Sequence, residues 1–264
     1  MQYKLALLGF GNVGRAFARL LMQKEQELQG TFGISFSVTG IATNHHGTAY
    51  DPGGLNLIES IKIVENGGSL SSLSNKPLPQ NNFEFIQLCG GDVLFENSPV
   101  DYKSGQPAMD HIQSALESGM HVVTANKGPI VHGYRKLSNL AAKKGKKILF
   151  ESTVMDGAPI FSLFRETLPA ANLIGFQGIL NSTTNLILTR METGSSFEDA
   201  VKFAQSIGIA ETDPSGDVDG WDSAVKVAAI VTVLMGEPLA PQQVDRQGIA
   251  DLNLSKIMAA KDEG

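Results

Sequence analysis

Two kinds of hydrophobic pattern alternate along the first half of the chain. The run "LALL" at 5–8 is short and continuous, as in a strand buried on both faces of a sheet. From Val13 onward the apolar residues fall at helical spacing, and "ISFSVTGIATN" at 34–44 predicts a second strand. A strand, a helix and a strand in this order predict a parallel sheet with right-handed crossovers.

The alternation continues to about residue 150. Between 44 and 80 the chain is rich in Gly, Ser, Asn and Pro, which predicts a surface excursion with little regular structure. Further strands are expected at 92–99, 121–127 and 146–153, and further helices near 54–65, 69–74, 105–119 and 134–145.

The pattern changes after residue 151. A turn and a helix are expected over 154–169 and a strand at 174–180, followed by helices at 181–194, 196–208, 219–236 and 252–264. The sequence therefore predicts an α/β protein with two domains. The first, 1–150, is predicted to be a Rossmann-type doubly wound parallel sheet, and the second, 151–264, is predicted to be a smaller α+β domain.

Composition narrows the class of protein. Hydrophobic residues make up 42% of the chain and charged residues 18%, which predicts a packed core. A net charge of −6 without a dense basic block disfavours nucleic-acid binding. The single cysteine, Cys89, fits a reducing compartment, and the run at 227–236 is about half as long as a membrane span. We therefore expect a cytoplasmic protein with no membrane or nucleic-acid partner.

A glycine loop stands between the first strand and the first helix. Gly9, Gly11 and Gly14 fit the pattern G-x-G-x-x-G, which allows a tight turn, close approach of a pyrophosphate, and close packing of helix on strand. The next amides, of Asn12 and Val13, begin a helix whose N-terminus favours phosphate. The pattern predicts dinucleotide binding; the alternative is a tight turn with no ligand.

The residues at the end of the second strand are expected to determine the preference for NAD or NADP. An acidic residue there would bind the ribose 2′-hydroxyl of NAD, but this chain has Thr43, Asn44, His45 and His46. The missing acid slightly favours NADP, although this loop has no arginine to bind a 2′-phosphate and NAD remains open. The two histidines are interpreted as loop residues, because no further ligands stand at metal-binding spacing.

An acidic stretch, "AETDPSGDVDGWDSAVK" at 210–226, precedes an apolar helix. Asp222 and Lys226 are four residues apart, so on a helix they share one face. Two interpretations stay open. The pair could act on a substrate that carries an amine and a reacting oxygen, or it could be an exposed surface ion pair.

Five segments together resemble the homoserine dehydrogenase family. They are "GFGNVG" at 9–14, "VVTANKGP" at 122–129, "ESTVMDGAPI" at 151–160, "GILNSTTNLIL" at 178–188 and "AQSIGIAETDPSGDVDGWDSAVK" at 204–226. "VMDG" replaces a glycine-rich turn, and Ser182 replaces a glycine. Family members continue past residue 264, so the second domain is expected to be incomplete at its C-terminus.

The resemblance implies an NAD(P)-dependent oxidoreductase that interconverts L-homoserine and L-aspartate 4-semialdehyde in threonine and methionine biosynthesis. It implies that the first domain binds NAD(P), that the second binds substrate and forms a homodimer, and that particular residues bind the substrate and the cofactor or act in catalysis. The implied catalytic residues are Lys226, Asp222 and Lys127; the substrate-binding residues are Glu211, Asp217, Asn181 and Thr183; Thr43, Asn126 and Lys127 join the glycine loop around the cofactor.

The resemblance also implies a Na⁺ site, formed by Glu151 and the backbone of Val154, Asp156 and Ala158. Two alternatives remain for the whole chain. One is another small amino-acid dehydrogenase on the same scaffold, and the other is a relative that binds the dinucleotide without catalysis.

Overall fold

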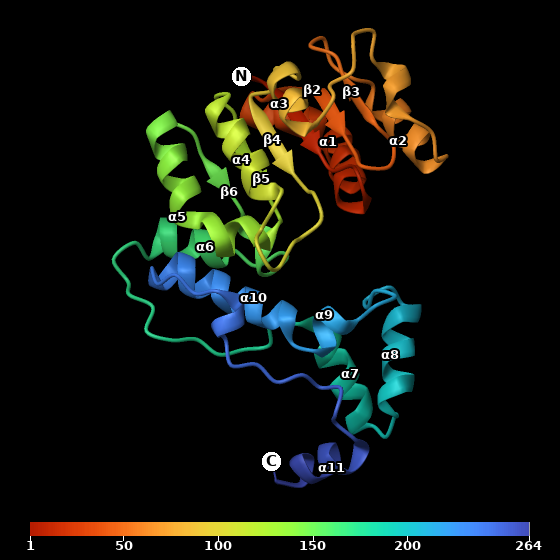
Figure 1. The fold of residues 1–264 in the computed structure, drawn as a ribbon, viewed down its shortest axis with the longest axis vertical. Coiled ribbons are helices and arrows are strands. Elements are labelled where there is room, and N and C mark those ends of the chain that lie inside the picture. The colour runs from red at the N-terminus through yellow and green to blue at the C-terminus, as the bar shows by residue number, and fades with distance from the viewer. Residues whose placement is uncertain (264) are drawn as a thin grey trace. The chain divides into compact units, whose positions relative to one another are not determined.

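The computed structural model describes residues 1–263, and Figure 1 shows the chain as a ribbon. The chain divides into two units, Met1–Asp156 and a second that begins at Gly157. The strands of the first unit are β1 (Gln2–Leu8), β2 (Ser35–Ala42), β3 (Thr48–Tyr50), β4 (Val93–Glu96), β5 (His121–Thr124) and β6 (Ile148–Leu149). Its helices are α1 (Asn12–Phe32), α2 (Leu57–Glu65), α3 (Asn82–Leu88), α4 (Ala108–Glu117) and α5 (Lys127–Lys144), with 3-10 turns η1 (Leu70–Leu73) and η2 (Glu151–Thr153).

Within the described residues, one sheet has the strand order β3-β2-β1-β4-β5-β6. Every neighbouring pair is parallel except β2 with β3, which is antiparallel. The predicted parallel, doubly wound sheet is confirmed. Because the order reverses between β1 and β4, the carboxyl ends of these strands form the crevice where such sheets bind ligands.

The apolar run of β1 is buried on both faces, as its pattern predicts. Leu5 and Leu7 pack into one core with α1 and α2, and Ala6 and Leu8 pack into another with α3, α4 and α5. Successive side chains of a strand point to opposite faces, so four consecutive apolar residues supply both cores.

The second unit, as far as residue 263, is helical (Figure 1). It contains α6 (Ile160–Ser162), α7 (Ser182–Glu192), α8 (Phe197–Ser206), α9 (Ser215–Val218), α10 (Trp221–Ile230) and α11 (Leu254–Glu263), π-helical turns η3 (Leu163–Thr167) and η4 (Val231–Met235), and the 3-10 turn η5 (Pro241–Gln243). Its core joins α7 and α8 through Ile187, Met191, Ala200 and Ala204. The last residue of the predicted helix 252–264 lies outside the described residues.

Two helices of the second unit begin at a residue whose side chain caps the first turn. Asn181 accepts the Thr184 amide at 2.8 Å, and Ser196 accepts the Asp199 amide at 3.1 Å. Each bond satisfies a backbone N–H that the first turn of a helix leaves without a partner. Local sequence therefore sets where α7 and α8 begin.

The strand predicted at 174–180 is wrong. The segment has no regular structure, and Ile174 is 93% exposed. A strand requires a partner for its backbone N–H and C=O groups, and no described segment of the second unit pairs with this one. Helix α3 and strand β3 were not predicted, because both are short and lie within the Gly-, Ser- and Asn-rich part of the chain or directly after it.

The long helix predicted at 219–236 is divided. Helix α10 ends at Ile230 and continues as the π-helical turn η4, which Gly236 terminates in the left-handed conformation at φ +74°. Among residues 1–263, no helix combines the length and apolar character that a bilayer crossing requires.

Candidate active site

A cavity of about 250 Å³ lies at the carboxyl ends of β1, β2 and β4. Its wall includes Gly9, Gly11, Arg15, Thr43 and His46, together with the residues that follow β4. This is the edge of the sheet at which the strand order reverses, so the cavity lies where a dinucleotide is expected.

The three glycines of the loop are each explained by their surroundings. Gly9 has φ +100°, and a Cβ there would overlap the Asn97 carbonyl oxygen. A Cβ on Gly14 would overlap the Gly9 carbonyl oxygen, whereas a Cβ on Gly11 would meet no described atom within 4 Å. Gly9 and Gly14 are thus required by the fold, and Gly11 leaves open backbone that a pyrophosphate can approach.

Arg15 is a cavity residue that the sequence reasoning missed. The strand-end loop does lack an arginine, but Arg15 reaches the same cavity from the first turn of α1. Its Nη1 donates to the Phe10 carbonyl oxygen at 3.1 Å, and its Nη2 donates to Asn12 Oδ1 at 2.8 Å. These two bonds fix the guanidinium, while Glu65 lies 3.9 Å from its Nε. Its position directly after Gly14 was the signal that could have identified it.

The other residues predicted around the cofactor divide into two groups. Thr43 lines the cavity, and its hydroxyl accepts the His46 amide at 2.7 Å. Asn12 and Val13 lie in the first turn of α1 but do not line the cavity, and Val13 is 61% exposed. Asn126 and Lys127 lie at the start of α5, where Asn126 Oδ1 accepts the Gly128 amide at 3.0 Å.

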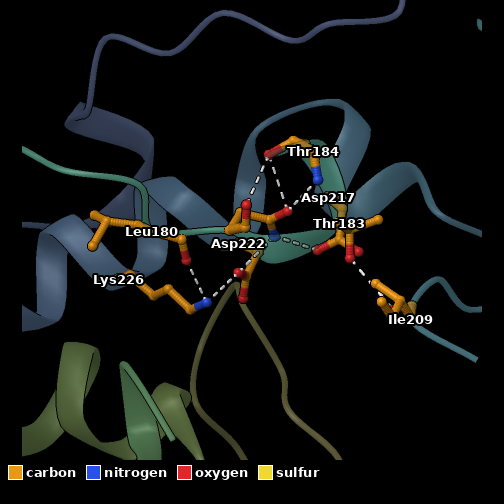
Figure 2. Close-up of polar contacts among 8 residues, drawn as sticks. Leu180, Thr183, Thr184, Ile209, Asp217, Asp222 and Lys226 are labelled. Carbon is orange, nitrogen blue, oxygen red and sulfur yellow. Dashed lines mark hydrogen bonds and ion pairs between the residues drawn. The ribbon is translucent and has the colours of Figure 1, made fainter. Parts of the chain in front are cut away.

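Asp217, Asp222 and Lys226 of the acidic stretch come together in the second unit (Figure 2). Lys226 Nζ is 2.8 Å from Asp222 Oδ2 and donates to the Leu180 carbonyl oxygen at 2.6 Å. Asn181 Nδ2 donates to Asp222 Oδ2 at 2.9 Å and to Asp217 Oδ1 at 2.6 Å. We call Asn181, Asp217, Asp222 and Lys226 the acid–lysine cluster.

The side chains of Lys226 and Asp222 are only 15% and 10% exposed. The alternative of an exposed surface pair is therefore wrong. Helix α10 places the two residues one turn apart, and Gly220, at φ +79°, turns the chain into that helix. Asn181 is fixed by capping α7, which leaves its NH₂ group to face the two carboxylates.

Two other predicted substrate residues form hydrogen bonds with residues outside this cluster. Thr183 is buried, and its hydroxyl donates to the Ile209 carbonyl oxygen at 3.4 Å. Glu211 is exposed, and its backbone carbonyl accepts a hydrogen bond from Gln205 Nε2 at 3.2 Å. Their roles toward substrate stay predictions.

The predicted Na⁺ ligands lie at the end of the first unit and the start of the second. Glu151 begins the 3-10 turn η2, Val154 is buried and Asp156 is exposed. The Ala158 carbonyl oxygen accepts the Ile160 amide at 2.9 Å, which leaves one lone pair for a cation. Among the described residues, no three His, Cys, Asp or Glu side chains are placed to hold a metal together.

Comparison with known proteins decides the family. Residues 9–151 match the family model described as homoserine dehydrogenase, NAD binding domain, and residues 159–264 match the one described as homoserine dehydrogenase. The chain belongs to the homoserine dehydrogenase family. It is 35% identical to the NAD(+)-dependent homoserine dehydrogenase of Pseudomonas canavaninivorans over 98% of this chain and 74% of that protein. It is also 35% identical to the homoserine dehydrogenase of Methanocaldococcus jannaschii, over 98% of this chain and 77% of that protein.

A solved structure agrees with the sequence comparison. A hyperthermophilic archaeal homoserine dehydrogenase in complex with NADPH matches with a TM-score of 0.80 and 33% identity, covering 96% of this chain and 75% of that chain. One homoserine dehydrogenase relative is thus described as NAD(+)-dependent and another holds NADPH. Membership of the family therefore establishes a nicotinamide-dependent oxidoreductase without choosing between the two dinucleotides.

Proposed function

We propose that this homoserine dehydrogenase uses the acid–lysine cluster as its proton-transfer site for interconverting L-homoserine and L-aspartate 4-semialdehyde. The observation that carries the proposal is the largely buried contact of Lys226 with Asp222, which Asn181 links to Asp217. A carboxylate pair suits the substrate ammonium, and a lysine suits the reacting oxygen.

The chemistry assigns one proton to Lys226. Gly9, Gly11 and Arg15 would hold the dinucleotide, whose nicotinamide would supply the hydride in the reductive direction and accept it in the oxidative one. When the aldehyde carbon receives the hydride, the Lys226 ammonium gives a proton to the aldehyde oxygen, and the neutral amine is reprotonated from solvent. Asp222 stabilises the ammonium before the transfer, because the pair is 2.8 Å apart with little solvent screening.

Several finer assignments belong to the same proposal. Lys127 is the second lysine of catalysis, and Glu211 and Thr183 contribute to substrate binding. Glu151 with three carbonyl groups offers the hard oxygen ligands that Na⁺ prefers. The proposal includes a homodimer, which the family resemblance supports, and a cytoplasmic location, which the single cysteine supports.

We propose NADP as the preferred dinucleotide, and Arg15 supports this. The loop after β2 has no acid to bind a ribose 2′-hydroxyl, while a fixed guanidinium lines the same cavity. Guanidinium groups bind phosphate well because they donate two parallel N–H bonds.

The test is oxidation of L-homoserine by the purified chain, followed by the absorbance of the reduced nicotinamide. Lys226→Ala should lower kcat by about 10²–10⁴-fold, which is the usual contribution of a general acid or base. The matched control is Lys202→Ala, because Lys202 is exposed on α8. An unchanged kcat in Lys226→Ala would remove the proton-transfer role. Cofactor binding without turnover of the wild-type chain would favour a non-catalytic relative, and turnover of a different amino alcohol would favour another dehydrogenase.

A second pair of variants tests the dinucleotide preference. Arg15→Gln should lower kcat/KM for NADP⁺ relative to NAD⁺ by about 10–150-fold, because a hydrogen bond to a charged group contributes about 1.5–3 kcal/mol. Arg19→Gln is the control, since Arg19 also pairs with Glu65 on α2 but does not line the cavity. An equal loss for both dinucleotides would contradict the proposed selection.

A further inference from the structure

Glu96 is a buried carboxylate that the proposed chemistry does not use. It is the last residue of β4 and is 0% exposed. In the sheet its Cα pairs with Leu8 of β1 on one side and with Thr124 of β5 on the other. Glu96 therefore lies directly beneath the edge of the sheet where the cavity opens. Glutamate side chains are almost never buried this completely unless they are paired.

The carboxylate faces neutral donors. One oxygen, Oε1, accepts the Ser98 backbone amide at 3.0 Å and also the Ser98 hydroxyl. The other, Oε2, accepts the Thr124 hydroxyl at 3.1 Å, and this hydroxyl also lies 2.9 Å from the Glu96 carbonyl oxygen. Burial raises the pKa of Glu96 above its ordinary value, and the hydrogen bonds only partly oppose this effect.

The contacts of Glu96 form a closed ring with a second polar side chain. The Thr124 hydroxyl accepts the Asn126 amide at 3.0 Å. Asn126 Nδ2 donates to the Ser98 carbonyl oxygen at 3.2 Å and to the Pro99 carbonyl oxygen at 3.4 Å. Starting from Glu96, the bonds pass through Thr124 and Asn126 and return through Ser98.

The ring joins two loops that matter for the proposed reaction. The loop 97–99 lines the cavity, and its Asn97 carbonyl lies against Gly9. The loop 125–126 leads into α5, whose first residue is Lys127. Glu96 holds the first loop directly through Ser98 and reaches the second through Thr124, so one buried group influences the placement of both.

We propose that Glu96 is a positioning residue that sets the loop 97–99 against the dinucleotide and the start of α5 for catalysis. It touches neither reactant. The inference rests on the proposed use of the cavity for a nicotinamide dinucleotide. A small displacement of positioning groups is sufficient, since a shift of about 1 Å can cost about 10²-fold in rate.

The experiment compares Glu96→Ala with Glu96→Gln in the full chain. Glutamine keeps the ring, because its amide oxygen can accept both Ser98 donors and its NH₂ group can donate to the Thr124 hydroxyl. Glu96→Ala should raise the Kd for NADPH by about tenfold or more, and Glu96→Gln should stay within about threefold of wild type. Binding is measured by NADPH fluorescence in the absence of homoserine.

The matched control is Thr39→Val, which alters a buried hydroxyl of β2 in the same sheet, with a described contact to the Leu5 carbonyl oxygen only. It should leave the Kd for NADPH unchanged even where it lowers Tm. A Kd for Glu96→Ala equal to that of wild type would overturn the proposal. A loss of binding in Thr39→Val of the same size at equal Tm would also overturn it.

Thr124→Val keeps the test decisive if Glu96→Ala does not fold. It breaks the ring on the side of α5 and leaves the Glu96–Ser98 contacts in place. It should lower kcat by about fivefold or more with a Kd for NADPH within about threefold of wild type. Unchanged kcat would count against the positioning role. If wild type binds NADPH but does not oxidise homoserine, the proposed reaction fails while the binding comparison still decides the role of Glu96.

Discussion

Replacing Lys226 by methionine tests whether the acid–lysine cluster is held by the energetics that its geometry implies. Methionine keeps most of the apolar stem and removes the ammonium. Asp222 would then be a largely buried carboxylate that loses the ammonium but keeps the hydrogen bond from Asn181. Removing one partner of a buried ion pair costs about 3–5 kcal/mol, and because Asn181 remains we expect about 3 kcal/mol of lost stability in the second unit.

The double variant Asp222→Asn with Lys226→Met separates charge from packing. It removes both charges of the pair, so it should lower the free energy of unfolding by about 1 kcal/mol only. The two single changes should therefore be non-additive, with an interaction energy of about 2 kcal/mol or more. Lys202→Met is the control on α8 and should change stability by less than about 0.5 kcal/mol, because its side chain is exposed.

The assay is urea unfolding followed by tryptophan fluorescence. Trp221 is the single tryptophan of the chain and stands at the start of α10, one residue before Asp222. Its ring lies 3.7 Å beneath the Arg246 guanidinium, so its emission reports on the second unit. A cost below about 1 kcal/mol for Lys226→Met, or a double variant as costly as the sum of the singles, would refute the buried-pair reasoning.

The remaining predictions concern the first unit. Gly9→Ala should lower the free energy of unfolding by about 2 kcal/mol or more and weaken NADPH binding, because a side chain at φ +100° is strained and would overlap the Asn97 carbonyl oxygen. Thermal unfolding measures the first effect and NADPH fluorescence the second. The control is Gly30→Ala in α1, where a Cβ meets no described atom within 4 Å. Burial raises the folded-state pKa of Glu96 above its ordinary 4.5, so its contribution to stability is fully present below the unfolded pKa and is lost as pH rises through the folded pKa. The Tm of wild type minus that of Glu96→Gln should therefore fall as pH rises from about 4.5, and a difference independent of pH would contradict it.

The sequence predicts the parts of this chain that are set locally. The four-residue apolar run of β1 and the helical spacing after Val13 were sufficient for the first strand and helix, because both patterns repeat within one element. The pairing of Asp222 with Lys226 was also visible, since residues four apart share a helix face. The sequence did not show that these two side chains are buried, and their burial is what excludes the surface-pair interpretation.

The missed features depend on contacts between distant segments. Arg15 enters the cavity only because α1 begins beside the end of β2, and Glu96 gains its partners only because β4 lies next to β5. The strand expected at 174–180 is absent because it, too, depends on a distant segment. Its apolar residues suit a strand, but whether it pairs depends on another segment.

Two asparagines show why a local pattern can be correct and still incomplete. Asn181 and Asn126 each cap a helix through the side-chain oxygen, toward the amides of Thr184 and Gly128. Serine or aspartate would cap a helix as well. Only the amide also offers an NH₂ group, which Asn181 directs to Asp217 and Asp222 and which Asn126 directs to the carbonyls after β4. An aspartate at 181 would instead add a third carboxylate to the two already there. The choice of asparagine is thus explained by the cluster and the ring that these residues join, and helix capping alone does not require it.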